Sequence, residues 1–209
     1  MNRWASIIHP LCGLIKTTFG AKPQIELRTL AAAPVLIGFR FMKKTLKRLD
    51  SVHQKLISAI SPLEPNIYAL RPAEGEWSVA EIVQHLCLVE GRVTKELEAA
   101  IAREPRRVGF FRRLIPTSIV SLRLVRVKAP KAMNPLDSPA RDQAIENFDR
   151  ARSNLKSLCA AHSEERFRNI VFTHPFLGDI DGVATISFIG YHELRHYKQI
   201  REVLGKLKN

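Results

Sequence analysis

The chain has 209 residues, which is enough for one sizeable hydrophobic core but short for two independent ones. It carries 33 Lys and Arg against 20 Asp and Glu, a net charge of +13 at pH 7, with the 45% hydrophobic content of an ordinary globular protein. No apolar run reaches the roughly 18 residues of a membrane span, and three scattered cysteines exclude a disulfide framework and favour a reducing, cytoplasmic location.

Residues 1–41 lack an extended amphipathic pattern, and prolines at positions 10, 23 and 34 interrupt them. We expect this segment to be a loosely structured N-terminal extension and residues 42–209 to form the folded domain. The first helix is predicted from about Phe41 to Ile60, because apolar side chains recur along it on one stripe.

The second predicted helix has the clearest start. Ser78 is a suitable N-cap, and Glu81, three residues later, completes a capping box. The apolar stripe that follows ends near Ile101, and His85 falls on its edge.

A long connection over residues 102–137 separates the second helix from the third. Residues 103–131 contain nine basic side chains and one acidic one, so much of the excess charge lies there. A link of this length can carry the chain from one end of a bundle to the other and allow parallel neighbours.

The third helix is predicted to begin at Ser138-Pro139 and the fourth near Asp181. No segment alternates convincingly enough to predict a strand. The sequence therefore predicts an all-α protein, a four-helix bundle with one long crossover between its second and third helices.

A histidine pair on the fourth predicted helix is the strongest chemical signal. His192 and His196 are four residues apart, so a helix places both rings on one face, where one divalent transition metal can take two ligands. His85 lies in another apolar helix and becomes a third ligand if the two helices pack together. A lone histidine on such a stripe is more often a hydrogen-bonded core residue, and pairs at this spacing also arise by chance.

The segment His192-Glu193-x-x-His196 also satisfies a zinc-protease motif, which we do not favour. Gln199 and Glu202 occupy positions where the extended metzincin motif needs glycine and histidine. Of the remaining histidines, His53 and His162 suit either core or surface positions. His174 lies in a turn-like stretch that we interpret mainly as structural, with a place near the site as the minor alternative.

Three short motifs occur in order along the chain: Trp77-Ser78-x-x-Glu81-x-x-x-His85-Leu86, His174-Pro175-x-x-Gly178, and His192-x-x-Arg195-His196-x-x-Gln199-Ile200. Together they resemble the DinB-like (YfiT-like) superfamily of metal-dependent enzymes, over about residues 42–207. The resemblance implies a four-helix bundle with one crossover and a three-histidine site for zinc, nickel or a similar ion, placed here on His85, His192 and His196. Members with assigned roles include thiol-dependent S-transferases and a mycothiol-dependent isomerase.

Three protein ligands would leave one position open for water or a substrate atom. The first hypothesis is therefore a metal-dependent enzyme, of S-transferase or hydrolase type, that activates a low-molecular-weight thiol or water for a small-molecule substrate. Glu193 is a candidate catalytic base or an orienting residue, although a surface ion pair is the favoured interpretation. Arg195 is a candidate for holding an anionic substrate, and Glu193 or a carbonyl group is an equally good partner for it.

The alternative hypothesis is a nucleic-acid-binding or stress-associated interaction protein without catalysis. It rests on the basic crossover, whose Arg and Lys residues alternate with Phe110 and Phe111. We favour a solvated crossover loop that partly covers the bundle. A homodimer is also compatible with a bundle of this kind.

Overall fold

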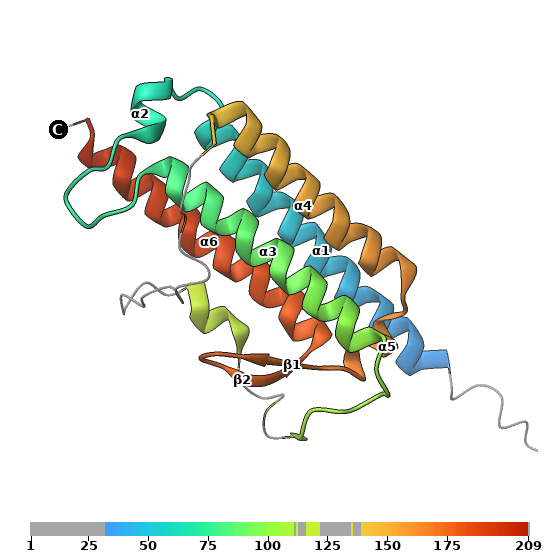
Figure 1. The fold of residues 1–209 in the computed structure, drawn as a ribbon. Coiled ribbons are helices and arrows are strands. Elements are labelled where there is room, and N and C mark those ends of the chain that lie inside the picture. Colours follow the sequence, from blue (N-terminus) through green and yellow to red (C-terminus); the bar gives the residue numbers. More distant parts are fainter. Residues whose placement is uncertain (1–31, 111, 113–115, 122–134, 136–138, 209) are drawn as a thin grey trace, which may run out of the picture.

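Four long helices form an elongated bundle in the computed structural model (Figure 1). The structure describes residues 32–110, 112, 116–121, 135 and 139–208, with side chains described from residue 41 onward. Shorter elements close its two ends. The elements are α1 (Ala32–Ile60), α2 (Pro65–Ala69), α3 (Val79–Ile101), the 3-10 helix η2 (Thr117–Ser121), α4 (Arg141–Ala161), α5 (Glu164–Arg168), β1 (Val171–His174), β2 (Gly178–Asp181) and α6 (Gly182–Lys206).

The predicted bundle and its long crossover are confirmed. Helices α3 and α4 run in the same direction, while α1 and α6 run in the opposite direction (Figure 1). The connection from the end of α3 to the start of α4 therefore leads back to the other end of the bundle. The 3-10 helix η2 belongs to this connection and packs against α6.

Helix α1 begins at Ala32, well before the predicted start near Phe41. Pro34 falls in its first turn, where the missing N–H costs no helical hydrogen bond. Helix α4 begins at Arg141, with Ala140 as its N-cap. Ser138, the predicted cap, and residues 1–31 of the predicted extension lie outside the described residues.

The prediction that the chain contains no strand is wrong. Strands β1 and β2 form an antiparallel hairpin in which Val171 pairs with Asp181 and His174 with Gly178. Gly178 has φ +68° at the end of the turn, a conformation that favours glycine. Gly182 follows, and a Cβ there would lie 2.8 Å from the Phe167 carbonyl oxygen, so α6 begins close against α5.

The start of α3 follows the predicted capping box. Ser78 Oγ accepts from the Glu81 N–H at 3.2 Å, and a Glu81 carboxylate oxygen accepts from the Ser78 N–H at 2.8 Å. Arg71 also pairs with Glu81. The first turn of α3 is thereby fixed, one turn before His85.

Ser78→Ala is expected to lower the free energy of unfolding by about 1 kcal/mol, because the Glu81 N–H loses its cap. Urea denaturation measures the change. Ser58→Ala, at an exposed position inside α1, is the control and should lie within about 0.5 kcal/mol of wild type. Equal effects of the two substitutions would show that the cap contributes nothing.

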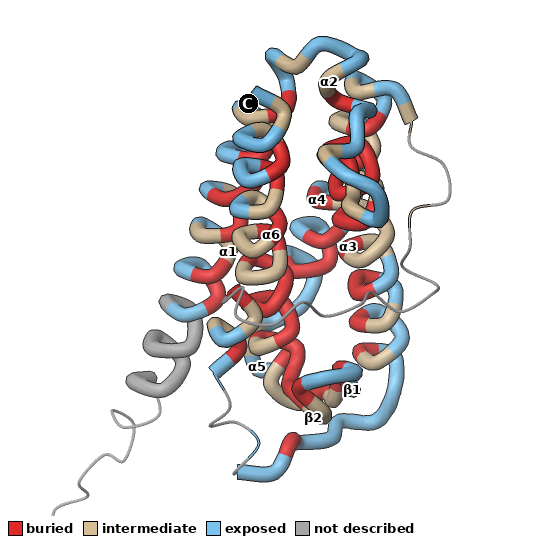
Figure 2. The backbone as a smooth tube through the Cα atoms, turned by 90° about the vertical axis from the view of Figure 1, so that its left-hand side faces the viewer, coloured by how far each residue is buried: buried red, intermediate tan, exposed pale blue. Residues whose placement is uncertain are grey.

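Buried residues lie on the inward faces of the long helices (Figure 2). Two apolar clusters fill the bundle, one centred on Leu97 and Ile186 towards the hairpin and the other on Leu56 and Ile82 towards α2. Among the described residues, no helix is both long and apolar enough to cross a bilayer.

Candidate metal centre

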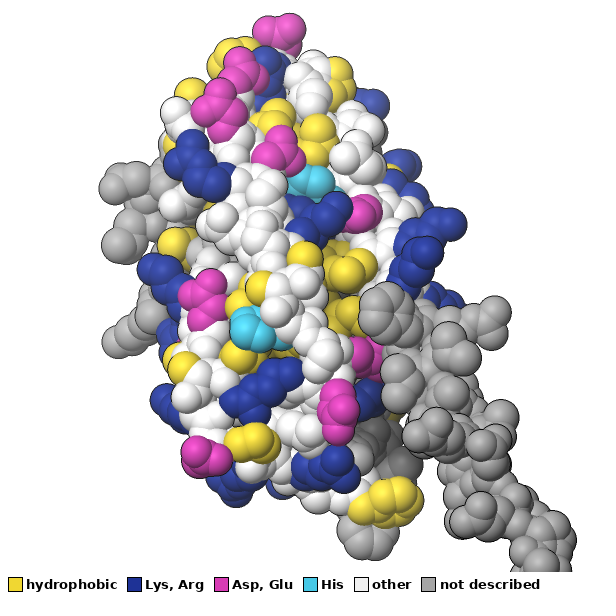
Figure 3. Space-filling model, turned by 90° about the vertical axis from the view of Figure 1, so that its right-hand side faces the viewer, with side chains coloured by type: hydrophobic (Ala, Val, Ile, Leu, Met, Phe, Trp, Pro, Cys, Tyr) yellow, Lys and Arg dark blue, Asp and Glu magenta, His cyan; other side chains and the backbone are white. Residues whose placement is uncertain are grey.

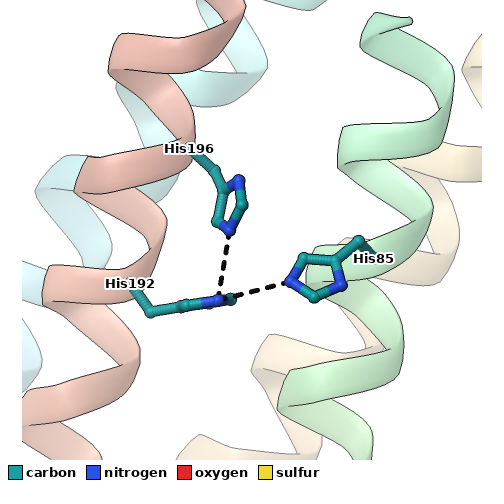
Figure 4. A group of neighbouring side chains, drawn as sticks. All are labelled: His85, His192 and His196. Atoms are coloured by element: carbon teal, nitrogen blue, oxygen red, sulfur yellow. Dashed lines mark hydrogen bonds between the residues drawn. The ribbon is translucent and has the colours of Figure 1, made fainter. Parts of the chain in front are cut away.

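Three histidines from two neighbouring helices meet between α3 and α6. His85 projects from α3, and His192 and His196 project from successive turns of α6 (Figure 4). His192 Nε2 lies 3.3 Å from His85 Nε2 and 3.2 Å from His196 Nε2. One ligand atom from each of the three residues lies within 4.8 Å of the others. The structure thus brings together the three residues that the sequence singled out.

The two separations at His192 Nε2 match those between ligands of a zinc-type ion. Nitrogens bound at about 2.0–2.1 Å in tetrahedral geometry are separated by about 3.3–3.4 Å. Hydrogen bonds between neutral rings do not account well for both contacts, because His192 Nε2 carries either one N–H or one lone pair and so serves a single partner in either tautomer. A shared cation satisfies all three nitrogens at once, so the residues fit a metal.

Gln199 orients one of the three rings, a role that the sequence analysis did not assign to it. His196 Nδ1–H donates to Gln199 Oε1 at 2.9 Å, which leaves the lone pair of Nε2 directed at the cluster. Such a partner on the far nitrogen fixes both the tautomer and the ring orientation of a metal-binding histidine. The spacing from His196 to Gln199, three residues along one helix face, was the signal available in the sequence.

Aromatic side chains flank the cluster. The Trp77 ring lies 5.1 Å from His85, and the Phe188 ring lies 5.4 Å from His192. His85 and His196 are buried and His192 is half-buried. Burial, followed by the charges of His196 and His85, lowers the pKa of His192 well below its usual value. His192 is therefore neutral at pH 7, as a metal ligand must be.

Gln199→Leu is expected to weaken zinc binding by about 10- to 100-fold, because His196 loses the acceptor that holds its Nδ1–H. Competition with a chromophoric chelator measures the affinity. Gln54→Leu, an exposed substitution on α1, is the control and should leave the affinity unchanged. Unchanged zinc binding in Gln199→Leu would remove the orienting role.

The other described histidines are not members of the cluster. His53 is buried and contacts Asp149 at 2.6 Å, whereas His162 is exposed. His174 Nδ1 accepts from the N–H groups of Phe176 and Leu177, both at 3.1 Å, which confirms its structural role in the turn. Its ring also packs 4.4 Å from Phe188, so His174 lies beside the cluster.

Glu193 does not lie on the surface, and the interpretation as a surface ion-pair partner is wrong. Its side chain is 1% exposed and pairs with Arg152, which also contacts Glu90 at 2.7 Å. The helix turns about 100° between consecutive residues, so Glu193 points into the bundle while His192 points at His85. A catalytic role for Glu193 stays a prediction, since the structure engages this carboxyl group with Arg152.

The two described cysteines are poor nucleophiles. Burial raises the pKa of both Cys87 and Cys159 to about 12, so each remains a thiol at neutral pH. Cys12 lies outside the described residues. Neither described cysteine is therefore a candidate for the reacting thiol, and we expect such a thiol to come from another molecule.

Three described basic residues of the crossover contact the rest of the fold. The Arg106 N–H and the Arg107 side chain both bond Asn169, at 2.8 Å and 2.6 Å, and Arg112 lies against Gly178. The remaining basic residues of the crossover, from position 113 to position 131, lie outside the described residues. On the face shown in Figure 3, acidic side chains lie among the basic ones.

The sequence and fold match known proteins. A model described as the DinB superfamily matches residues 48–200, which contain all three clustered histidines. The chain is 27% identical to the protein YuaE of Bacillus subtilis (strain 168) over 139 residues, 66% of this chain and 83% of YuaE.

Two solved structures share the fold. YfiT from Bacillus subtilis, described as "a probable metal-dependent hydrolase with an unusual four-helix bundle topology", is similar with a TM-score of 0.57 and 15% identity. The match covers 90% of this chain and 94% of YfiT. The four-helix bundle protein TT2238 is similar with a TM-score of 0.53 and 20% identity, over 77% of this chain and 98% of that one.

Proposed function

Because the chain belongs to the DinB superfamily, we propose that it is a metal-dependent enzyme acting on a small molecule in the cytoplasm. His85, His192 and His196 hold one divalent transition ion, with zinc or nickel favoured. The observation that carries the proposal is the convergence of three Nε2 atoms from α3 and α6. Three imidazoles suit zinc, nickel, copper and iron, so the donor set selects a class of metal.

The residues of the chain have separable tasks at this centre. The three histidines offer neutral nitrogens from two rigid helices, and Gln199 holds His196 in the required tautomer. Trp77 and Phe188 limit the access of water, while the half-buried His192 leaves one side of the centre approachable. A bound ion supplies an open position at which the pKa of a water or thiol falls towards neutrality.

Two reaction types share these requirements. The description of YfiT as "a probable metal-dependent hydrolase" supports water as the nucleophile. The engagement of Glu193 with Arg152 supports the thiol alternative, because a free thiol, with a pKa near about 8.5, needs less help from a base than water does. We put hydrolysis first and transfer to a low-molecular-weight thiol second.

An activity panel tests the proposal. Protein loaded with zinc or nickel is assayed with activated esters and amides, and with small electrophiles in the presence and absence of cysteine or glutathione. We expect turnover that requires the metal. It should fall at least about 100-fold in His85→Ala, because this variant loses a proposed metal ligand and with it the metal-dependent rate. His162→Ala, which removes an exposed histidine, is the control.

The dependence on the added thiol separates the two reaction types. Turnover without a thiol indicates hydrolysis, and strict dependence on a thiol indicates S-transfer. A rate that survives metal removal and His85→Ala would contradict the proposed function.

A further inference from the structure

A cavity lies between α1, η2 and α6, on a different face of α6 from the histidine cluster. Its volume is about 260 Å³, and Phe41, Lys44, Arg48, Pro116, Ser187 and Tyr191 are among the residues that line it. Along α6, Ser187 and Tyr191 point about 100° or more away from His192 and His196, which face α3. The cavity is therefore separate from the histidine cluster.

The charges around this cavity have one sign. Lys44 and Arg48 come from successive turns of α1, and none of the described lining residues is acidic. Arg48 is positioned by Tyr191, because its Nη1 donates to the phenol oxygen and its guanidinium carbon lies 4.8 Å from the ring centre. A planar guanidinium has five N–H donors, so Arg48 retains donors for an anion.

Buried hydroxyl groups complete the lining. Thr45, Thr117 and Ser187 are 7%, 9% and 9% exposed, respectively. Thr117 Oγ1 donates to Ser187 Oγ at 3.4 Å, a long contact for two hydroxyls, whose usual separation is about 2.7–2.8 Å. Hydroxyls held in this way can turn towards an oxyanion, and hydrogen bonds to charged groups are the stronger ones.

A neighbouring groove between α1 and α6 provides the comparison. It also contains two basic residues, Lys55 and Arg201, together with hydroxyl-bearing side chains. Its basic and serine side chains are exposed, so water already solvates them. The groove and the cavity therefore each contain two basic side chains. Of the two, only the cavity beside η2 combines them with buried hydroxyls.

We propose that the cavity beside η2 binds the oxyanion group of a small molecule, of the phosphate-ester class. Lys44 and Arg48 neutralise the anion, and the hydroxyls of Thr117 and Ser187 donate to it. Phe41, which is 48% exposed, and Pro116 contact the apolar part of the molecule. This site does not depend on the metal centre.

Calorimetric titration with inorganic phosphate, at ionic strength held constant with chloride, tests the site. Wild type should bind one phosphate, and Lys44→Gln/Arg48→Gln should weaken binding at least about tenfold. Lys55→Gln/Arg201→Gln removes the same charge from the comparison groove and should change the affinity less than about twofold. Thr117→Val, which keeps the side-chain shape, should weaken binding about three- to tenfold.

Two further arms locate the anion. Phenyl phosphate should bind more tightly than inorganic phosphate, because its ring contacts Phe41 and Pro116. Binding should persist in His85→Ala, which removes a histidine of the metal centre. Equal losses in the two charge-matched double variants, no gain for phenyl phosphate, or loss of binding in His85→Ala would each overturn the proposal.

Discussion

Arg152→Ala is expected to lower the free energy of unfolding by about 3–5 kcal/mol. Arg152 is 4% exposed and lies between the carboxyl groups of Glu90 and Glu193, each 1% exposed. Its Nε and Nη2 contact Glu90 at 2.7 and 3.1 Å, Nη2 also contacts Glu193, and Nη1 donates to the Leu49 carbonyl oxygen at 3.1 Å. Removal of this guanidinium leaves two buried carboxyl groups without their cation.

The ion network joins all four long helices at mid-height, because Leu49, Glu90, Arg152 and Glu193 belong to α1, α3, α4 and α6. Burial, with the nearby Glu90 contributing, raises the pKa of Glu193 well above its usual value even though Arg152 opposes the shift. Loss of Arg152 removes that opposing charge, so the two carboxyl groups retain the cost of burial without compensation.

Urea denaturation of Arg152→Ala measures the effect, with Arg150→Ala, an exposed substitution on the same helix, as the control. The control should change stability by no more than about 0.5 kcal/mol. Replacing Arg152, Glu90 and Glu193 together by Met, Leu and Leu should recover most of the loss, because no unpaired charge remains. A change below about 1 kcal/mol in Arg152→Ala would contradict a network that holds the helices together.

His192→Ala is expected to weaken zinc binding by about two to three orders of magnitude. His192 is the central ring, since its Nε2 faces both His85 and His196. Structural zinc sites with four ligands bind with about 10–16 kcal/mol, so an equal share for one ligand is about 2.5–4 kcal/mol. Competition with a chromophoric chelator measures the loss.

Tyr191→Phe provides a matched control for His192→Ala. Tyr191 is the adjacent residue, but it lies on another face of α6, where its hydroxyl contacts Arg48 of α1. Zinc affinity should therefore be unchanged in Tyr191→Phe. An equal loss in both variants would indicate general damage to α6, and no loss in His192→Ala would remove this residue from the centre.

Local patterns in the sequence predicted the parts of the fold and site that depend on neighbours along one helix. The Ser78–Glu81 box set the start of α3, and the four-residue spacing put His192 and His196 on one face of α6. The approach of His85 required the packing of two helices, which followed from the predicted bundle and the family resemblance. The structure brings these three rings together.

Other features depend on contacts between distant segments, which no local pattern contains. Glu90, Arg152 and Glu193 each look like solvent-facing charges in their own helices, and only the packing of three helices buries them together. The hairpin escaped prediction because each strand has four residues, too few for a clear alternation, and depends on pairing across a glycine turn. The interpretation of Glu193 as a surface residue was wrong because its burial depends on helix packing, which its own helix does not reveal.

The ratio of metal to protein, measured by elemental analysis after loading with zinc or nickel and gel filtration, tests the proposed centre most directly. Wild type should retain one ion per chain, whereas His85→Ala and His196→Ala, which change different helices, should each retain close to none. An absence of bound metal in wild type, or full retention in both folded variants, would contradict the three-histidine centre.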